Sequence, residues 1–314
     1  MIKAAMLGIS TAVILSTGAF GQTISIGSSP QGSLNYAAAA AVSTVSNQAA
    51  NLKARAIPQG GPIVTLPLVN NSELDFSITN AVNAYFAFRG TSTFKSRGKQ
   101  ENIRVVAALF PLEMAWFVRK DSDIKTISDL KGKRISSKLS KQKSILLQQR
   151  AMLATVGLSV KDTVGVPTPN GERQLQDFMS GKIDAYNYSL SSGLTKQAHA
   201  KVGVRALSLP DTPAALKALR KHAPGSRIEN RNPNPKYGFI TAPTNIMVVP
   251  FLIMSSAKVS DEIVYKVTKA IFENQKKLIA SHKVFLSMEK KKLHVDVGVP
   301  YHAGAVKFYK EMGL

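Results

Sequence analysis

A glycine- and serine-rich turn near residue 30 carries the first residue types that suit binding chemistry. The segment Ser28-Ser-Pro-Gln-Gly-Ser33 joins an apolar stretch, 23–27, to an alanine-rich one. If a strand leads through it into a helix, the free backbone N–H groups and the positive helix end suit a carboxylate or phosphate. The candidate ligand-binding residues of this turn are Ser28, Ser29, Gln31 and Gly32. An ordinary strand-to-helix turn is the alternative, and the turn alone favours it.

Further positions at predicted turns are candidates for the same site. Gly60 and Gly61 lie in Gln59-Gly-Gly-Pro62, where glycine lets the backbone approach a ligand closely. Asn80 follows a third apolar stretch, at the point where a parallel strand would end. Tyr36 fits the wall of a pocket and the hydrophobic core equally well.

The chain has none of the usual signatures of catalysis or metal binding. It contains no cysteine, and its five histidines show no metal-ligand spacing. There is no Gly-x-Ser-x-Gly nucleophile motif and no phosphate-binding loop ending in Gly-Lys-Ser/Thr. We therefore expect no catalytic residue, no metal and no cofactor. A serine–histidine pair assembled by the fold would escape this search.

The charge of the chain is strongly positive. Its 314 residues carry a formal net charge of +22. Such a field attracts anionic ligands, acidic partners or anionic lipid. Nucleic acid is not expected as a partner, because the lysine clusters lack interleaved aromatic residues and a binding motif. Most of the lysines are interpreted as a solvated surface.

Residues 1–21 have the pattern of a signal peptide. Lys3 precedes an apolar run from Ala4 to Leu15, and small residues stand ahead of a cut between Gly21 and Gln22. The run is shorter than the ~20 residues that a membrane span needs. The mature chain is therefore expected in the periplasm, without a lipid anchor because no cysteine can carry one.

The remaining chain alternates predicted strands and helices, which is typical of α/β folds with a parallel sheet. Strands are expected near 23–27, 53–57 and 75–79, each followed by a helix. Open parallel sheets bind ligands at the carboxyl ends of their strands. The three turns described above therefore belong at one edge of the sheet.

The middle of the chain begins with an apolar run, 105–118, that predicts one or two strands. A short helix is expected over 124–130, and a strand from Arg134, an order that predicts a βαβ unit. Toward the C-terminus, 246–254 predicts a strand and 261–282 one long helix.

Several segments together resemble the solute-binding proteins of TRAP transporters, in the TAXI family. The matching segments are Gly27 to Tyr36, Gly60-Gly61, Glu73 to Ile78, Asp121 to Ile135, Gly181 to Ala185 and Val299 to Ala305. They extend over nearly the whole mature chain. The early turn combined with Pro-Tyr-His-x-Gly-Ala near the C-terminus is the most specific feature.

The resemblance implies an α/β, two-lobed periplasmic binding protein (Venus-flytrap) fold with a hinge and a cleft between the lobes. Residues 22–107 would form lobe 1, completed by about 231–314, and residues 108–230 would form lobe 2. The resemblance further implies a monomer that captures a small anionic solute, such as a carboxylate, dicarboxylate or acidic amino acid. TRAP membrane permease subunits would be the partner that receives it.

The resemblance also selects candidate residues in lobe 2, where this chain departs from its relatives. They carry a Gly-Ser-Gly-rich loop at the position of 136–144, whereas this chain has Lys138, Lys141 and Lys143. Either these lysines bind a more anionic ligand, or they lie at the rim and steer it. Ser140 or Ser144 is expected to cap the following helix. Relatives often have glutamine at the position of Asn80, so the site here would be larger.

Three more candidates come from the predicted crossover and from a strand that should face the cleft. Glu113 can accept a hydrogen bond from an ammonium ligand or form a salt bridge with a surface arginine, which is the commoner case. Asn187 and Tyr188 follow the strand that begins at Ile183.

Three other function classes fit the same residues. An ABC-type or sensor-linked binding protein has the same fold and the same mode of ligand binding but a different partner. An exported enzyme on the same scaffold would turn its ligand over. A scavenger of anionic polymers would bind with strong salt dependence and little shape selectivity.

Overall fold

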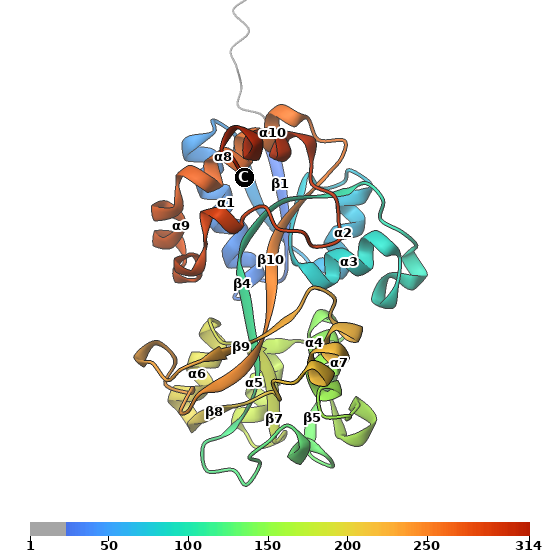
Figure 1. Cartoon of the computed structure of the whole chain (residues 1–314), viewed down its shortest axis with the longest axis vertical. Coiled ribbons are helices and arrows are strands. Elements are labelled where there is room, and N and C mark those ends of the chain that lie inside the picture. Colours follow the sequence, from blue (N-terminus) through green and yellow to red (C-terminus); the bar gives the residue numbers. More distant parts are fainter. Residues whose placement is uncertain (1–22) are drawn as a thin grey trace, which may run out of the picture.

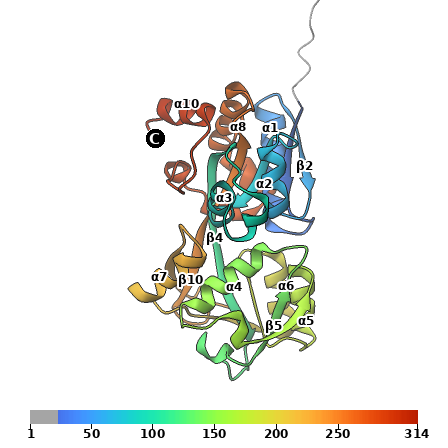
Figure 2. The same ribbon diagram turned by 90° about the vertical axis from the view of Figure 1, so that its right-hand side faces the viewer.

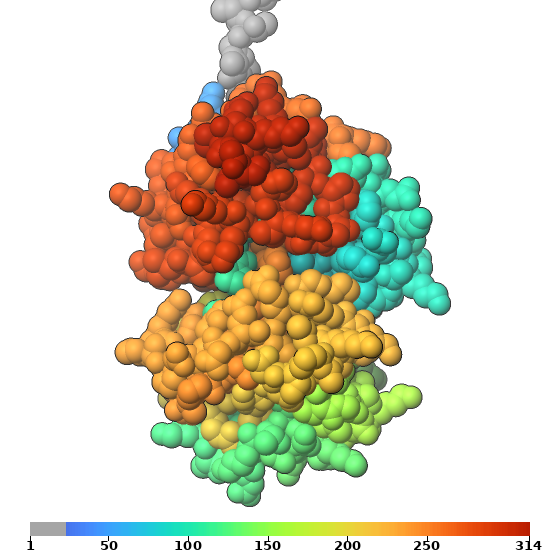
Figure 3. Space-filling view, viewed as in Figure 1, coloured from blue at the N-terminus to red at the C-terminus, as the bar shows by residue number. Residues whose placement is uncertain are grey.

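The computed structural model describes residues 23–314, and the predicted signal peptide lies outside this range. Two lobes stand one above the other and are joined by two long strands (Figure 1). The first part of the chain and the C-terminal helices form the upper lobe, and the middle of the chain forms the lower lobe (Figures 1 and 2). A waist separates them on the face shown in Figure 3.

The upper lobe contains three parallel strands with helices on both sides. Its elements are β1 (Thr23–Ser28), β2 (Lys53–Pro58), β3 (Phe76–Asn80), α1 (Leu34–Ala49), α2 (Pro62–Asn70), α3 (Ala81–Arg89), α8 (Asp261–Glu273), α9 (Gln275–Ser281) and α10 (Ala303–Glu311). Strand β1 lies between β2 and β3, and the ends of β1 and β3 face the lower lobe. The loops that carry the predicted turns therefore meet at the waist.

The lower lobe contains its own parallel strands and helices. Its elements are β5 (Arg134–Lys138), β6 (Val164–Thr168), β7 (Ala185–Ser189), β8 (Val204–Leu207), β9 (Arg227–Arg231), α4 (Ser144–Ala154), α5 (Gly171–Met179), α6 (Gly193–Val202) and α7 (Pro213–His222). Strand β5 pairs in parallel with β6 and β7.

Strands β4 (Ile103–Arg119) and β10 (Thr244–Ser256) cross from one lobe to the other as an antiparallel pair. They join the two halves into one sheet with the strand order β2-β1-β3-β10-β4-β7-β5-β6, while β8 pairs with β4 and β9 with β10. Both strands are almost entirely apolar and buried, because the sheet is covered on both faces.

Two prolines stand opposite each other in the crossing strands. Pro111 pairs in register with Pro250, and the register shifts just beyond, between Phe251 and Leu252. A proline has no N–H to donate to the sheet, so the hydrogen-bonded ladder is weakened at this point on both strands at once. We infer that bending between the lobes is concentrated here.

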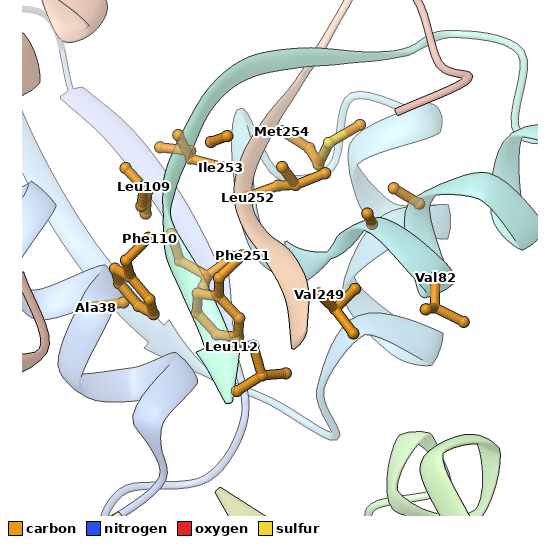
Figure 4. Close-up of a cluster of buried hydrophobic side chains, with 14 of the residues drawn as sticks. Ala38, Val82, Leu109, Phe110, Leu112, Val249, Phe251, Leu252, Ile253 and Met254 are labelled. Carbon is orange, nitrogen blue, oxygen red and sulfur yellow. The ribbon is translucent and has the colours of Figure 1, made fainter. Parts of the chain in front are cut away.

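The hydrophobic core continues across this hinge. Buried side chains of β4 and β10, including stacked Phe110 and Phe251, pack with Ala38 of α1 and Val82 of α3 (Figure 4). The ring centroids of the two phenylalanines are 4.8 Å apart. A second cluster, around Phe117, Phe178 and Tyr186, lies in the lower lobe. The first cluster also includes lower-lobe side chains such as Ile135 and Leu147, so one core extends across both lobes.

The predicted βαβ unit and the long C-terminal helix are wrong. The run 105–118 is one strand, β4, whose neighbours are β10, β7 and β8, while β5 lies beyond β7. The region 124–130 forms only a 3₁₀ turn, Ser128–Leu130. The long helix ends at Glu273, because the backbone at Asn274 leaves the helical conformation (φ −109°, ψ 36°), and α9 starts afresh.

The predicted lobe boundary at residue 231 also needs correction. Residues 231–249 pack in the lower lobe, where the first half of β10 pairs with β9 and contributes Ile246 and Val248 to the second cluster. The chain returns to the upper lobe only near Pro250. The crossing is made by the apolar strand β10.

The contact between α10 and α8 gives a first testable prediction. A Cβ atom at Gly304 would overlap the backbone carbonyl of Asp261. We expect Gly304→Ala to destabilise the protein by about 1–3 kcal/mol, because neither backbone can move freely. Urea unfolding measures this difference.

The matched control is Gly193→Ala, at the start of α6, where an added Cβ meets nothing within 4 Å. Its free energy of unfolding should stay within about 0.5 kcal/mol of the parent value. Equal stability of both variants would contradict the close packing of α10 on α8.

Candidate functional site

A small cavity lies where the two lobes face each other, beside the crossing strands. Its wall is formed by Ser33, Leu34, Asn35, Pro62 and Asn80 of the upper lobe, by Gln142, Ser144, Ile145, Gln148, Tyr188 and Ser189 of the lower lobe, and by Leu112, Met114 and Phe251 of the crossing strands. This cleft cavity encloses about 50 Å³. Ordinary small-molecule sites enclose about 300 Å³ or more. The lobes must therefore separate to admit an organic solute.

Four helices begin at the wall of the cleft cavity. Ser33 and Asn80 are the N-caps of α1 and α3. Pro62 and Ser144 are the first residues of α2 and α4. The first N–H groups of a helix have no partner within it, and the helix dipole makes that end positive. The cavity thus has a positive potential, although none of the described residues on its wall has a charged side chain.

The side chain of Asn80 is held in one orientation by its role as a cap. Its Oδ1 accepts hydrogen bonds from the backbone N–H and the side-chain amide of Asn83, at 3.0 and 3.2 Å. The residue is only 4% exposed. Because the oxygen is engaged, the amide nitrogen is the group of Asn80 that remains for a ligand.

Gln148 brings an unpaired polar atom to the wall of the cleft cavity. It lies on α4, is 3% exposed, and its Oε1 has no hydrogen-bond partner among the described residues. A buried polar atom without a partner costs about 1–3 kcal/mol. The Oε1 of the adjacent Gln149 is unpaired as well, but Gln149 differs at its Nε2, which donates to the carbonyl and the hydroxyl of Ser136. A polar group of a ligand would remove the cost at Gln148.

A second hollow, of about 180 Å³, adjoins the cleft cavity and shares Ser33, Gln142 and Tyr188 with it. Its other wall residues are Pro30, Gln31, Gly32, Asn170, Glu172 and Leu194. Gln142 is fixed there, because its Oε1 accepts the backbone N–H of Gly171 at 2.9 Å. Burial raises the pKa of Tyr188, and the amide of Gln142 opposes this only in part. The phenol therefore stays protonated and can donate.

A larger hollow, of about 380 Å³, lies on the other side of the crossing strands, against Pro111 and Pro250. Its charged groups are paired with one another. Arg231 contacts Glu113 at 2.7 Å and Glu229 at 2.9 Å. Because these charges are already satisfied, we do not place the solute site there.

The structure brings some of the predicted site residues to the cleft. Asn80, Ser144 and Tyr188 line the cleft cavity, and Gln31 and Gly32 line the adjoining hollow. The other candidate residues of the two early turns are not on the wall of either cavity. Ser28 is buried, and its Oγ donates to the carbonyls of Ser29 and Ile57. A Cβ at Gly61 would overlap the Oγ of Ser29. Gly60 lies at the same turn, and the hydroxyl of Tyr36 accepts a hydrogen bond from Gln31 at 3.5 Å.

The lysine-bearing loop lies outside the wall of the cleft cavity. Ser140, Lys141 and Lys143 are exposed. The expectation that Ser140 or Ser144 caps α4 is wrong, because Lys143 occupies the cap position without a side-chain hydrogen bond, and Ser144 is already in the helix. Lys138 and Leu139 have positive φ, 65° and 32°. The loop therefore keeps a backbone conformation that favours glycine, although the glycines are absent.

Two further candidates have structural partners. The carboxylate of Glu113 pairs with Arg231 and accepts a hydrogen bond from Tyr237 at 3.3 Å, in agreement with the salt-bridge alternative. Asn187 is fully buried inside the lower lobe, and its Nδ2 donates to the carbonyl of Ile145 at 3.3 Å. Neither lies on the wall of the cleft cavity.

Sequence reasoning missed Gln142, in the turn before α4, and Ile145 and Gln148 on α4, which line the cavity. These three residues recur every third position, and this spacing was the available signal. Leu112, Met114 and Phe251 were also missed, because the apolar strands gave no sign of which face is open.

The described residues contain no group of three or more histidine, aspartate or glutamate side chains that could hold a metal ion. Within residues 23–314, none of the helices is both long and apolar enough to cross a bilayer.

Solved structures with the same arrangement of lobes are known. Malate-bound MatC from Rhodopseudomonas palustris has a TM-score of 0.57 and 11% identity, over 84% of this chain and 88% of that one. Methylphosphonate-bound PhnD1 from Prochlorococcus marinus has a TM-score of 0.56 and 11% identity, over 93% and 97%. The alkanesulfonate-binding protein SsuA from Xanthomonas axonopodis pv. citri, bound to MOPS, has a TM-score of 0.52 and 14% identity, over 94% and 92%. At these identities the likeness shows the fold.

A comparison with a family model also gives a match. The model of the NMT1-like family matches residues 26–313, which is nearly all of the described chain. The two lobes, the crossing strands and the cleft agree with the two-lobed fold of periplasmic binding proteins. This chain belongs to the NMT1-like family and has that two-lobed fold.

Proposed function

We propose that this protein is a solute-binding protein, not an enzyme, that captures a small solute in the cleft cavity and delivers it to a membrane transporter. The observation that carries the proposal is the buried, unpaired amide of Gln148 at a cavity whose wall comes from both lobes. A ligand that contacts both lobes has a higher affinity for the closed form than for the open one. It therefore shifts the population toward closure.

The inferred hinge and the comparisons with solved structures also support a solute-binding function. The opposed prolines of β4 and β10 allow bending without loss of the core that the lobes share. The three structural relatives are bound to malate, methylphosphonate and MOPS. For this chain we infer an anionic organic solute, because four helix N-termini meet at the cavity.

The location and the partner are part of the proposal. The export pattern of residues 1–21 supports a periplasmic protein, and the matching segments described above, with Pro300-Tyr-His-Ala-Gly-Ala305 near the C-terminus, support a TRAP permease as the receiver. Uptake by vesicles that contain a TRAP permease, with and without the protein, tests the partner. Uptake that does not depend on the protein would contradict it.

Thermal unfolding of residues 22–314 with a panel of small carboxylates, sulfonates, phosphonates and amino acids tests the function. A solute that binds only the folded protein at about a hundred times its Kd adds about 2.7 kcal/mol to the stability. We expect a shift for a narrow set of chemically related anions. An unchanged unfolding temperature across the whole panel would contradict solute binding.

Substitution of Gln148 tests solute binding separately from the stability of the fold. We expect Gln148→Met to leave the ligand-free protein as stable as the parent, or more stable by up to about 1 kcal/mol, because it removes an unpaired buried polar group. The same change should weaken solute binding at least about tenfold, a loss of about 1.4 kcal/mol. Urea unfolding and calorimetric titration measure the two effects.

The matched control is Gln149→Met, one residue away on the same helix. It also removes an unpaired Oε1, but it breaks two hydrogen bonds to Ser136 and leaves those groups without that donor, so it should destabilise the protein by about 1–3 kcal/mol. If instead Gln148→Met destabilises as much as Gln149→Met and leaves the affinity intact, Gln148 is a structural residue and the site is misplaced.

The exposed lysines near the cleft give a kinetic prediction. We expect the double change Lys141→Gln/Lys143→Gln to slow association about two- to fivefold at low salt, with an unchanged dissociation rate, because exposed charges steer rather than hold. Stopped-flow binding at several salt concentrations measures both rates. Lys276→Gln/Lys277→Gln, on exposed positions of α9, removes equal charge elsewhere. A change confined to the dissociation rate would place Lys141 and Lys143 against the ligand.

A further inference from the structure

We propose that the solute of the cleft is a monoanion with an apolar body, not a dianion or an amino acid. This inference rests on the proposed function and names the substrate class of the same site. It follows from which groups line the cleft cavity and from which charges are missing there.

The anionic end of the solute is assigned to the meeting point of the helix N-termini. Leu34 and Asn35 begin α1, and Ser144 begins α4 from the opposite lobe. Their N–H groups can donate to one carboxylate or sulfonate when the lobes close. The Gln148 amide is the second observation that points to a ligand, since turning it over presents its NH₂ group in place of the unpaired oxygen.

The rest of the cavity wall is apolar. Leu112, Met114 and Phe251 of the crossing strands lie there with Ile145 of α4, each of them at most 6% exposed. Apolar area removed from water favours a ligand whose body is hydrocarbon. A hydroxylated or doubly charged body would lose its hydration at these side chains without gaining hydrogen bonds.

Among residues 23–314, the cleft cavity has no side chain on its wall that could neutralise a second charge. The wall of the cleft cavity, within the described part of the chain, carries neither a cation nor a carboxylate. The adjoining hollow has one charged residue, the exposed Glu172, which repels a second anionic group. The lysines of the 138–143 loop point to solvent outside both walls. A dianion would therefore bury an unpaired charge, and an α-ammonium group inside the cleft cavity would find no carboxylate on its wall, because Glu172 is exposed in the adjoining hollow.

Binding of a matched series of five-carbon compounds tests the proposal by calorimetry. The probes are pentanoate and pentane-1-sulfonate as monoanions, glutarate as the dianion, norvaline as the zwitterion and pentanamide as the neutral compound, with benzoate as a rigid monoanion. We expect a monoanion to bind at least about 100-fold more tightly than glutarate, norvaline and pentanamide, because each of these leaves a polar or charged group unmatched.

The variant Asn80→Asp tests the sign of the charge without removing the helix cap. Aspartate caps a helix as well as asparagine does, so α3 should remain intact. The added negative charge at the cavity should weaken monoanion binding at least about tenfold at neutral pH. Asn234→Asp, an exposed cap of the Pro235–Tyr237 turn away from the cavity, is the control and should leave the affinity unchanged.

The outcomes separate this inference from the proposed function. Preferred binding of glutarate, norvaline or pentanamide, or tighter binding by Asn80→Asp, overturns the substrate class but leaves solute binding intact. Failure of every compound in this series and in the wider panel overturns both. If Asn80→Asp unfolds, the ranking of the compounds on the parent protein still decides the question.

Discussion

The antiparallel pairing of β4 with β10 is the constraint on which the rest of the structure depends. These strands hold both lobes in one sheet and carry the core from one lobe to the other. Their alternation places Leu112, Met114 and Phe251 toward the cleft cavity, and Pro111, Glu113 and Pro250 toward the hollow on the other side. One pair of strands thus connects the two lobes and forms part of the wall of both hollows.

The positive charge of the molecule acts over long distances, whereas the helix N-termini act only within the cleft cavity. The net charge of +22 and the exposed lysines near the cleft act over the Debye length and raise the local concentration of anions. Inside the cleft cavity the positive potential comes from helix N-termini and neutral donors, which can hold one charge without a long flexible side chain. Attraction is therefore broad, whereas selection depends on the shape and the polarity of the wall.

Much of the fold followed from the sequence, because alternating apolar stretches and glycine turns have local causes. Asn80 and Tyr188, which the sequence places near the ends of strands, line the cleft cavity, and Gln31 and Gly32 of the early turn line the adjoining hollow. The pairing of β4 with β10 was not found, because an apolar run does not encode its partner. The position of Gln148 at the cavity could not be predicted from the sequence either. Its neighbour Gln149 has the same type and burial, and only the three-dimensional structure shows which of the two is hydrogen-bonded to Ser136.

Closure of the lobes on a solute is the central claim, and a distance measurement between spin labels tests it most directly. The chain has no cysteine, so Ser96→Cys in the upper lobe and Lys161→Cys in the lower lobe, both exposed, would be the sole labelling sites. The distance should be longer and broadly distributed without solute, and shorter and narrower with the anion that gives the largest thermal shift. An unchanged distribution in the presence of a saturating, stabilising solute would contradict closure on the cleft.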